Sequence, residues 1–398
     1  MKTHVFLKIA ILSCFTLNCF SQKTEPLPKT QPLLWQGDIA SRLIDSCDVF
    51  LLNQIDLSVE RRKQYWERDF SSKSAYETSV EKNRTHFAEI IGVKENRHTF
   101  SHPVLINKVA ENELFTVSEV SWPVFGQVHS EGLLVTPNNG KITHGIIVVP
   151  DADQTPEELI GISGNLFPEK QTARIYAEKG YQVLILTIID RNTKHKKISN
   201  REFLYRSAFE LGRHIIGYEV QKILAGVDWF TAQGLQNIAV SGWGEGGLLA
   251  FYSGAIDTRI DQTFVSGYFG SRLNIWQEPA YRNVFGLLEQ FGDAEIASMI
   301  APRELIVSSE NDAPVVIIPE GTESKPGRLK ALETEAVEKE IKRLNSMMSA
   351  LKWEVIIRKP EKPNLLKIEK FDLPDAKSRH DRLMTELDMH NQWLLHES

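Results

Sequence analysis

The hydrophobic positions follow different periods in successive parts of the chain. Near the N-terminus, apolar residues recur at the spacing of a helix, as in Ile39, Leu43 and Ile44. Between about 100 and 137 apolar and polar residues alternate, which predicts antiparallel strands. From Gly145 onward short apolar runs recur, as expected for strands buried on both faces, at 146–149, 183–189, 238–240, 263–265, 305–307 and 355–357.

Amphipathic stretches separate these apolar runs, and we expect helices at 169–179, 208–232 and 329–351. Alternation of strands and helices predicts an α/β fold with a mostly parallel sheet flanked by helices. We divide the chain into a signal peptide (1–21), a helical N-terminal preface (22–100), the α/β domain (101–360) and a linker with a C-terminal helix (361–398).

The first residues have the pattern of a secretory signal peptide. Lys2 and Lys8 flank the start of an apolar run over 5–20, and Ser21 is a small residue before the expected cleavage point. The run is short for a membrane span. We therefore expect export to the periplasm or the medium, with a lipid anchor at Cys14 or an uncleaved anchor as alternatives. Cleavage leaves Cys47 without an intramolecular disulfide partner.

Composition narrows the class of protein. The 398 residues are 42% hydrophobic and 25% charged, which excludes a disordered chain or a disulfide scaffold. A formal net charge of −6 argues against a nucleic acid partner, since phosphate binding needs a concentrated basic face.

The most specific motif is the Gly-rich segment 240–247, Val-Ser-Gly-Trp-Gly-Glu-Gly-Gly, between a predicted strand and a predicted helix. It resembles the nucleophile elbow of α/β-hydrolases, in which a tight turn exposes a serine. Segments 201–220, 276–295 and 300–303 are similar to bacterial dienelactone-hydrolase-like and acetyl-xylan-esterase-like proteins. The resemblance covers roughly 100–360. It implies an α/β-hydrolase fold and a carbohydrate or small-molecule ester as ligand.

The chain departs from this family's chemistry where the nucleophile is expected. Gly244 occupies the serine position, and Ser241 lies three residues earlier, in the strand. The segment after the last predicted strand contains no histidine before His380. Asp312 could be the acid of a triad but would have nothing to orient. We therefore reject a standard Ser-His-Asp triad.

Acidic residues follow several predicted strands, where an α/β sheet binds its ligands. We name Glu245, Asp151, Asp153 and Asp190 as candidate acid/base residues, since carboxylates in unlike surroundings can serve as acid and base. Short Asp side chains also cap helices and turns, which is the alternative for Asp151 and Asp153. Further candidates for ligand binding are Trp243, Gly244, Arg213, His214, Glu310 and Asp312.

Each of these binding candidates also has a structural interpretation. A histidine within the long helix 208–232 is more often structural than catalytic. Arginines and glutamates between 201 and 219 suggest an ion-pair network that fixes this segment. Trp243, Trp276, Tyr268 and Tyr281 could stack on sugar rings or belong to the core. We expect no cofactor and no metal.

Three functions remain open on the sequence. The first is an exported hydrolase acting on carbohydrate or its esters without the usual triad. The second is a non-catalytic pseudo-hydrolase that binds a glycan or a protein, and the third is a serine esterase with displaced residues. The C-terminal helix, which carries Leu383, Leu387 and Trp393, either docks on its own domain or contacts a further protein module.

Overall fold

The protein is described by a computed structural model, which covers residues 26–195, 198–308, 316–317, 327–330, 333–359 and 363–397. The predicted signal peptide and the candidates Glu310 and Asp312 lie outside the described residues. The chain forms two compact units, Met1–Gln54 and Ile55–Ser398. In the described part of the first unit most apolar side chains are exposed, including Leu43, Ile44 and Phe50.

The second unit is built on a ten-stranded sheet with the order β13-β10-β9-β8-β4-β5-β3-β2-β1-β14. Five neighbouring pairs, from β13 across to β5, are parallel. The remaining pairs are antiparallel. The strands are β1 Val104–Glu111, β2 Phe115–Phe125, β3 Val128–Pro137, β4 His144–Val149, β5 Gln182–Leu186, β8 Asn237–Trp243, β9 Gln262–Ser266, β10 Glu304–Ser308, β13 Ile356–Arg358 and β14 Glu369–Lys370.

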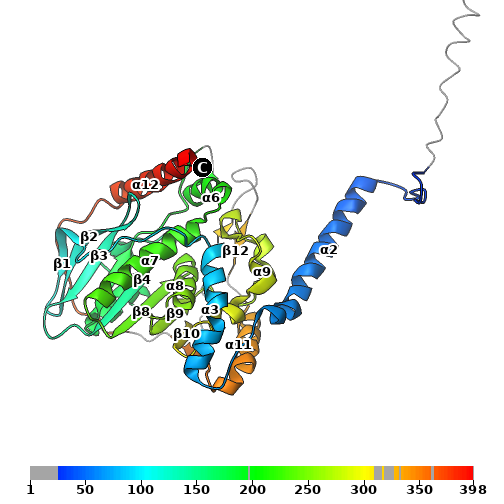
Figure 1. Cartoon of the computed structure of the whole chain (residues 1–398). Helices are drawn as coiled ribbons and strands as arrows, with labels where there is room; N and C mark the ends of the chain where they lie inside the picture. Colours follow the sequence, from blue (N-terminus) through cyan, green and yellow to red (C-terminus); the bar gives the residue numbers. More distant parts are fainter. Residues whose placement is uncertain are drawn as a thin grey trace, which may run out of the picture. The chain divides into compact units, whose positions relative to one another are not determined.

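Helices lie on both faces of this sheet, which confirms the α/β prediction (Figure 1). The α-helices are α2 Ile39–Arg61, α3 Lys73–Ile90, α4 Pro156–Leu159, α5 Thr172–Glu178, α6 Asn200–Glu210, α7 Ile215–Ala232, α8 Glu245–Ile256, α9 Leu287–Gln290, α10 Asp293–Ser298, α11 Thr334–Met348 and α12 Ala376–Glu397. Short 3-10 turns are η1 Arg62–Tyr65, η2 Pro168–Lys170, η3 Ile275–Gln277, η4 Ala280–Arg282 and η5 Ser349–Leu351. Two separate two-stranded antiparallel sheets pair β6 Thr193–His195 with β7 Ile198–Ser199 and β11 Val316–Ile317 with β12 Arg328–Leu329.

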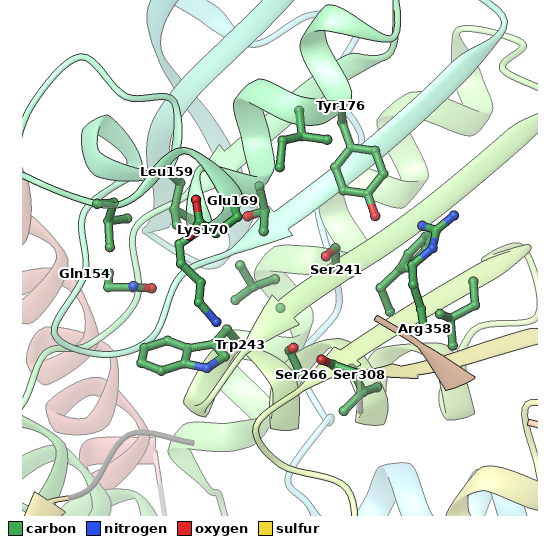
Figure 2. Close-up of a pocket in the computed structure, with 18 of the residues that line it drawn as sticks. Gln154, Leu159, Glu169, Lys170, Tyr176, Ser241, Trp243, Ser266, Ser308 and Arg358 are labelled. Atoms are coloured by element: carbon green, nitrogen blue, oxygen red, sulfur yellow. The ribbon is translucent and has the colours of Figure 1, made fainter. Parts of the chain in front are cut away.

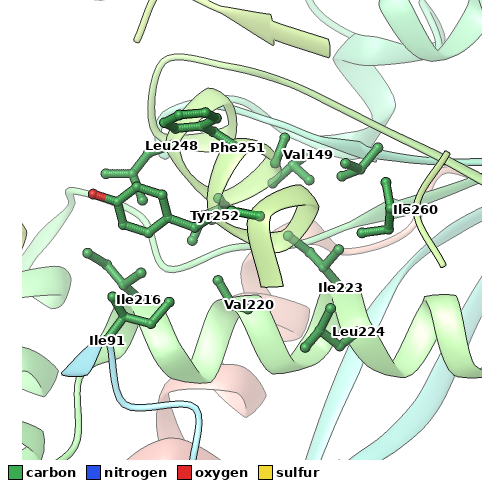
Figure 3. Packing of buried hydrophobic residues seen from close by; sticks show 14 of the residues in the cluster. Ile91, Val149, Ile216, Val220, Ile223, Leu224, Leu248, Phe251, Tyr252 and Ile260 are labelled. Atoms are coloured by element: carbon green, nitrogen blue, oxygen red, sulfur yellow. The ribbon is translucent and has the colours of Figure 1, made fainter. Parts of the chain in front are cut away.

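The main core lies on one face of the sheet. Helix α7 turns Ile216, Val220 and Ile223 toward α8, which contributes Leu248 and Tyr252 (Figure 3). Helices α3, α10, α11 and α12 add buried apolar side chains to the same cluster. A second, smaller cluster occupies the other face, where α4 and α5 pack with Ile146, Val148 and Ile185.

One predicted helix was wrong. The long helix expected over 208–232 is broken into α6 and α7 by a turn, in which Gly212 has φ 64°. Arg213 and His214 lie in this turn and not within a helix. The physical reason is the left-handed backbone of Gly212, which ends the first helix, after which His214 caps the second one.

The C-terminal helix α12 docks on its own domain, beside α6 and β3 (Figure 1). Arg379 donates to both oxygens of Glu157 at 2.8 Å, and the Asn391 side chain accepts from Tyr218 at 2.7 Å. Met389 and Trp393 on the same helix remain exposed. Within the described residues, no helix is long and apolar enough to cross a membrane.

Candidate functional site

A tight turn between β8 and α8 forms the centre of the candidate site. Gly244 has φ 59° and ψ −116°, a conformation that glycine adopts with little strain. Its N–H donates to the Ser266 carbonyl at 3.0 Å, and its carbonyl accepts from Leu248 N at 3.1 Å. A Cβ on Gly246 would lie 2.2 Å from the Val149 carbonyl oxygen. The glycines therefore allow strand, turn and helix to approach closely.

Glu245, the first residue of α8, is fully buried and surrounded by three arginines. Its carboxylate accepts from Arg282 Nη2 at 2.8 Å, from Arg191 Nη2 at 3.2 Å and from Arg201 Nη2 at 3.3 Å. Burial alone would raise the pKa of Glu245, but Arg282, Arg201 and Arg191 outweigh it and hold the pKa well below its usual value. The side chain is therefore ionised.

The Asp151 carboxylate accepts a hydrogen bond from the first main-chain N–H after the turn. Its Oδ1 accepts from the Glu245 backbone N–H at 2.8 Å, while Arg191 binds both carboxylate oxygens at 2.6 and 3.1 Å. In an α/β-hydrolase elbow, the N–H after the nucleophile belongs to the oxyanion hole. Here that donor is bound to a carboxylate of the same chain.

We call Asp151, Arg191, Arg201, Glu245 and Arg282 the elbow cluster. Its arginines have further acidic partners at the periphery: Arg191 binds Asp153 at 2.8 Å, Arg201 binds Glu219 at 2.9 Å and Arg282 binds Glu278 at 3.0 Å. Each arginine is thus held by at least two carboxylates. The cluster is a buried, mutually neutralising network in which every guanidinium has a fixed direction.

The structure brings three of the four predicted acid/base residues together. Asp151, Asp153 and Glu245 all contact Arg191, although Asp153 has a half-exposed side chain. Asp190 faces elsewhere, because its carboxylate accepts from Asn200 at 2.7 Å and lies 3.4 Å from His380 Nε2. Helix α4 is capped by Thr155 and not by either aspartate, but the Asp151 carboxylate accepts from the first N–H of α8 and from the Asp153 N–H of its own turn.

Arg213 and His214 lie outside the elbow cluster. Arg213 pairs with Glu95 at 2.5 Å. His214 is the N-cap of α7, and its Nδ1 accepts from the Ile216 N–H at 3.0 Å. The ring proton therefore lies on Nε2, which donates to the Asn283 carbonyl at 3.1 Å. Burial lowers the pKa of His214 to about 4, so the ring is neutral near pH 7.

Two ion pairs of the network predicted for segment 201–219 are present, and the third arginine has its partner outside the segment. Arg201 pairs with Glu219 and Arg206 with Glu202, whereas Arg213 reaches Glu95 from the preface. Arg191 and Arg282 were not among the predicted site residues. Arg191 directly follows Asp190 and was visible as a strand-end cation, but nothing in the sequence placed Arg282 beside Glu245.

A groove with a cavity volume of about 330 Å³ lies beside α5, on the sheet face opposite the main core (Figure 2). Its floor contains two rows of side chains that run across the strands. On one strand the two rows are two residues apart, because every second side chain points to the same face of a sheet. The inner row is Ser241, Phe264 and Ile306, which are register partners on β8, β9 and β10. The outer row, at the carboxyl ends of the strands, is Trp243, Ser266, Ser308 and Arg358.

Helix α5 and the η2 turn form the wall above these rows. Tyr176 projects from α5 over the inner row, and it lines the groove together with Ser241 (Figure 2). Figure 2 shows Lys170 and Trp243 at one end of the groove and Arg358 at the other. The Arg358 guanidinium lies 5.7 Å from the centre of the Phe264 ring. The groove is apolar within and charged at its rim.

Of the aromatic residues proposed to stack on sugars, Trp243 alone lines this groove among the described residues. Tyr268 and Tyr281 are buried, and Tyr281 packs against Arg201 of the elbow cluster. Trp276 is exposed at η3, outside the groove. Trp243 was among the predicted binding residues, whereas Tyr176, Phe264, Ile306 and Arg358 were not.

The fold has relatives among solved structures. No family model matches the chain, and no curated protein does. A solved structure of a protein named as an acetyl xylan esterase, from Bacteroides fragilis, is similar with a TM-score of 0.53 at 15% identity. The alignment covers 73% of this chain and 77% of that chain. The chain has an α/β-hydrolase-like fold.

Another solved structure is similar at a lower level. A glucuronoyl esterase from Solibacter usitatus aligns with a TM-score of 0.48 and 11% identity, covering 80% of this chain and 94% of that chain. At these identities the likeness to the acetyl xylan esterase extends to the α/β-hydrolase-like fold.

Proposed function

We propose that this chain is an exported, non-hydrolytic α/β-hydrolase-fold protein that binds carbohydrate or a carbohydrate ester. The observation that carries the proposal is the hydrogen bond from the Glu245 N–H to Asp151, at the turn that carries Gly244. A glycine supplies no nucleophile, and a carboxylate on the main-chain donor repels a developing oxyanion. Gly244 then stands where the resembling family has its serine.

The surroundings of Glu245 also oppose an acid/base role. A general acid or base works best with a pKa near the operating pH. Three arginines keep the pKa of Glu245 far below that range, and their N–H groups occupy both of its oxygens. This supports the pseudo-hydrolase among the three functions and disfavours a Glu245-based hydrolase.

The proposed carbohydrate site is the Trp243 end of the groove. Trp243 offers a half-buried aromatic surface, and Gln154 and Ser266 supply hydrogen-bonding groups beside it. Aromatic faces beside polar groups suit sugar rings, which have apolar faces and polar edges. The name of the structural relative, an acetyl xylan esterase, suggests xylan-derived oligosaccharides as the first ligands to test.

The experiment is calorimetric titration of the mature protein with xylo-oligosaccharides, with and without acetyl groups. We expect binding that weakens about 5- to 10-fold in Trp243→Ala, which loses the stacking surface. Trp276→Ala is the matched control, because Trp276 is exposed outside the groove and its loss should leave binding unchanged. Equal affinities of Trp243→Ala and wild type would contradict this site.

The proposed export rests on the apolar run over 5–20 and on Ser21. Met389 and Trp393 of α12 are exposed, and they support the proposal that this helix contacts a further protein module.

A further inference from the structure

We propose that the Arg358 end of the groove binds an organic carboxylate with an apolar alkyl or aryl body. This ligand class follows from the groove itself and does not depend on the carbohydrate proposal. The apolar part would lie on the inner row, Ser241, Phe264 and Ile306, and the carboxylate would face Arg358.

Two residues of the inner row, Phe264 and Ile306, are apolar, and they lie on strands beyond those that the described helices of this face cover. The described helices there, α4 and α5, cover the strands from β3 to β4, and their cluster includes Ile146, Val148 and Ile185. Phe264 and Ile306, on β9 and β10, lie beyond the centre of that cluster and line the groove. Apolar side chains that face a cavity of this size are typical of ligand sites, which range from about 300 to 1,000 Å³.

Tyr176 closes this part of the groove from above. Its ring lies 5.6 Å from the Phe264 ring, centre to centre, so the two aromatic residues form adjoining walls. Burial raises the pKa of the Tyr176 hydroxyl, which therefore stays neutral. A long or flat apolar body fits between these walls better than a compact polar one.

The positive charge at the rim of the groove favours a negatively charged ligand. Four described lining residues are cationic, Lys170, Lys179, Arg358 and Lys359, while Glu169 is the single acidic one among them. The Arg358 guanidinium lies over the Phe264 ring, directly at the edge of the apolar floor. A planar guanidinium binds a carboxylate with two parallel hydrogen bonds. An apolar floor that ends at such a group suits an amphiphilic anion.

The test uses decanoate as the probe, with decanol and decyltrimethylammonium as neutral and cationic analogues of the same chain length. Calorimetric titration of the full mature chain should show decanoate binding at least about 10-fold more tightly than either analogue. Arg358→Gln should weaken decanoate about 10-fold or more, and Arg358→Glu should abolish binding. Arg206→Gln, on α6 and outside the groove, is the matched control and should bind as wild type does.

Two readouts distinguish loss of this site from misfolding and from loss of the carbohydrate site. Arg358 is exposed, so Arg358→Gln should keep the wild-type thermal unfolding temperature, and lost binding cannot then be ascribed to misfolding. Xylo-oligosaccharide binding should persist in Arg358→Gln, because the carbohydrate is proposed to lie at the Trp243 end. Testing the two ligands separately therefore distinguishes a failure of the carbohydrate proposal from a failure of the carboxylate proposal. Decanol binding as tightly as decanoate, unchanged affinity in Arg358→Gln, or no decanoate binding would each overturn the inference.

Discussion

The elbow cluster and the groove lie beside the same strand, β8, yet they have opposite characters. At the elbow, Glu245 has no exposed surface and its charge is balanced by three arginines. In the groove, Trp243 and Phe264 are partly exposed and Arg358 faces solvent. The buried ion-pair network leaves no room for a ligand, whereas the open apolar floor with its charged rim can bind one. The difference supports the proposal that the groove binds a ligand and that the elbow carries no reaction.

The largest effect is expected from breaking the elbow cluster. Glu245→Gln removes the charge that three buried arginines share, and an uncompensated buried charge costs about 3–5 kcal/mol of unfolding free energy. Urea unfolding followed by circular dichroism measures this loss. Glu60→Gln is the control, since its pair with Lys63 is mostly exposed and should contribute less than about 1 kcal/mol. Equal unfolding midpoints for Glu245→Gln and wild type would contradict a stabilising cluster.

A somewhat smaller effect is expected from pH, through His214. Its folded pKa of about 4 lies below the ordinary value of 6.5, so the unfolded chain binds a proton first as pH falls. The stability due to neutral His214 is complete above pH 6.5 and is lost progressively down to about pH 4. The full loss is of order 3 kcal/mol.

Unfolding free energies measured between pH 7 and 4 should therefore fall less steeply in His214→Asn than in wild type. Asparagine can still accept the Ile216 N–H as an N-cap, so the helix start is preserved. Identical slopes for the two proteins would show that His214 does not carry this pH dependence.

The smallest effect on stability is expected in the groove. Arg358→Gln removes an exposed cation whose described contact is the Phe264 ring, and it should change the unfolding free energy by less than about 1 kcal/mol. Urea unfolding alongside Glu245→Gln makes the comparison direct. A loss as large as that of Glu245→Gln would mean that the groove rim is structural, like the elbow.

The sequence allowed much of the fold to be predicted. Short apolar runs located the strands at 146–149, 238–240, 263–265 and 305–307, because strands buried on both faces are apolar throughout. The helix break at Gly212 was missed, because the apolar pattern continues across it. A turn needs one residue with positive φ, and glycine occurs within helices too often to identify it.

The site was predictable only in part. The grouping of Asp151, Asp153 and Glu245 could be predicted, because each follows a parallel strand and the carboxyl ends of such strands lie at one edge of the sheet. Arg282 could not be placed, because it reaches Glu245 from η4 through a long irregular connection. The groove was also missed. Its pairs two apart, such as Phe264 with Ser266 and Ile306 with Ser308, are visible in the sequence. Their exposure depends on which helices cover that face, and residue patterns do not reveal this.

The most direct test of the central claim is acetate release from acetylated xylo-oligosaccharides, measured with the mature wild-type protein at a ligand concentration that saturates binding. We predict release at the rate of buffer alone, together with no labelling by a fluorophosphonate probe. Acetate release well above that rate, abolished in a Glu245→Gln protein whose circular dichroism matches wild type, would contradict a closed reaction centre.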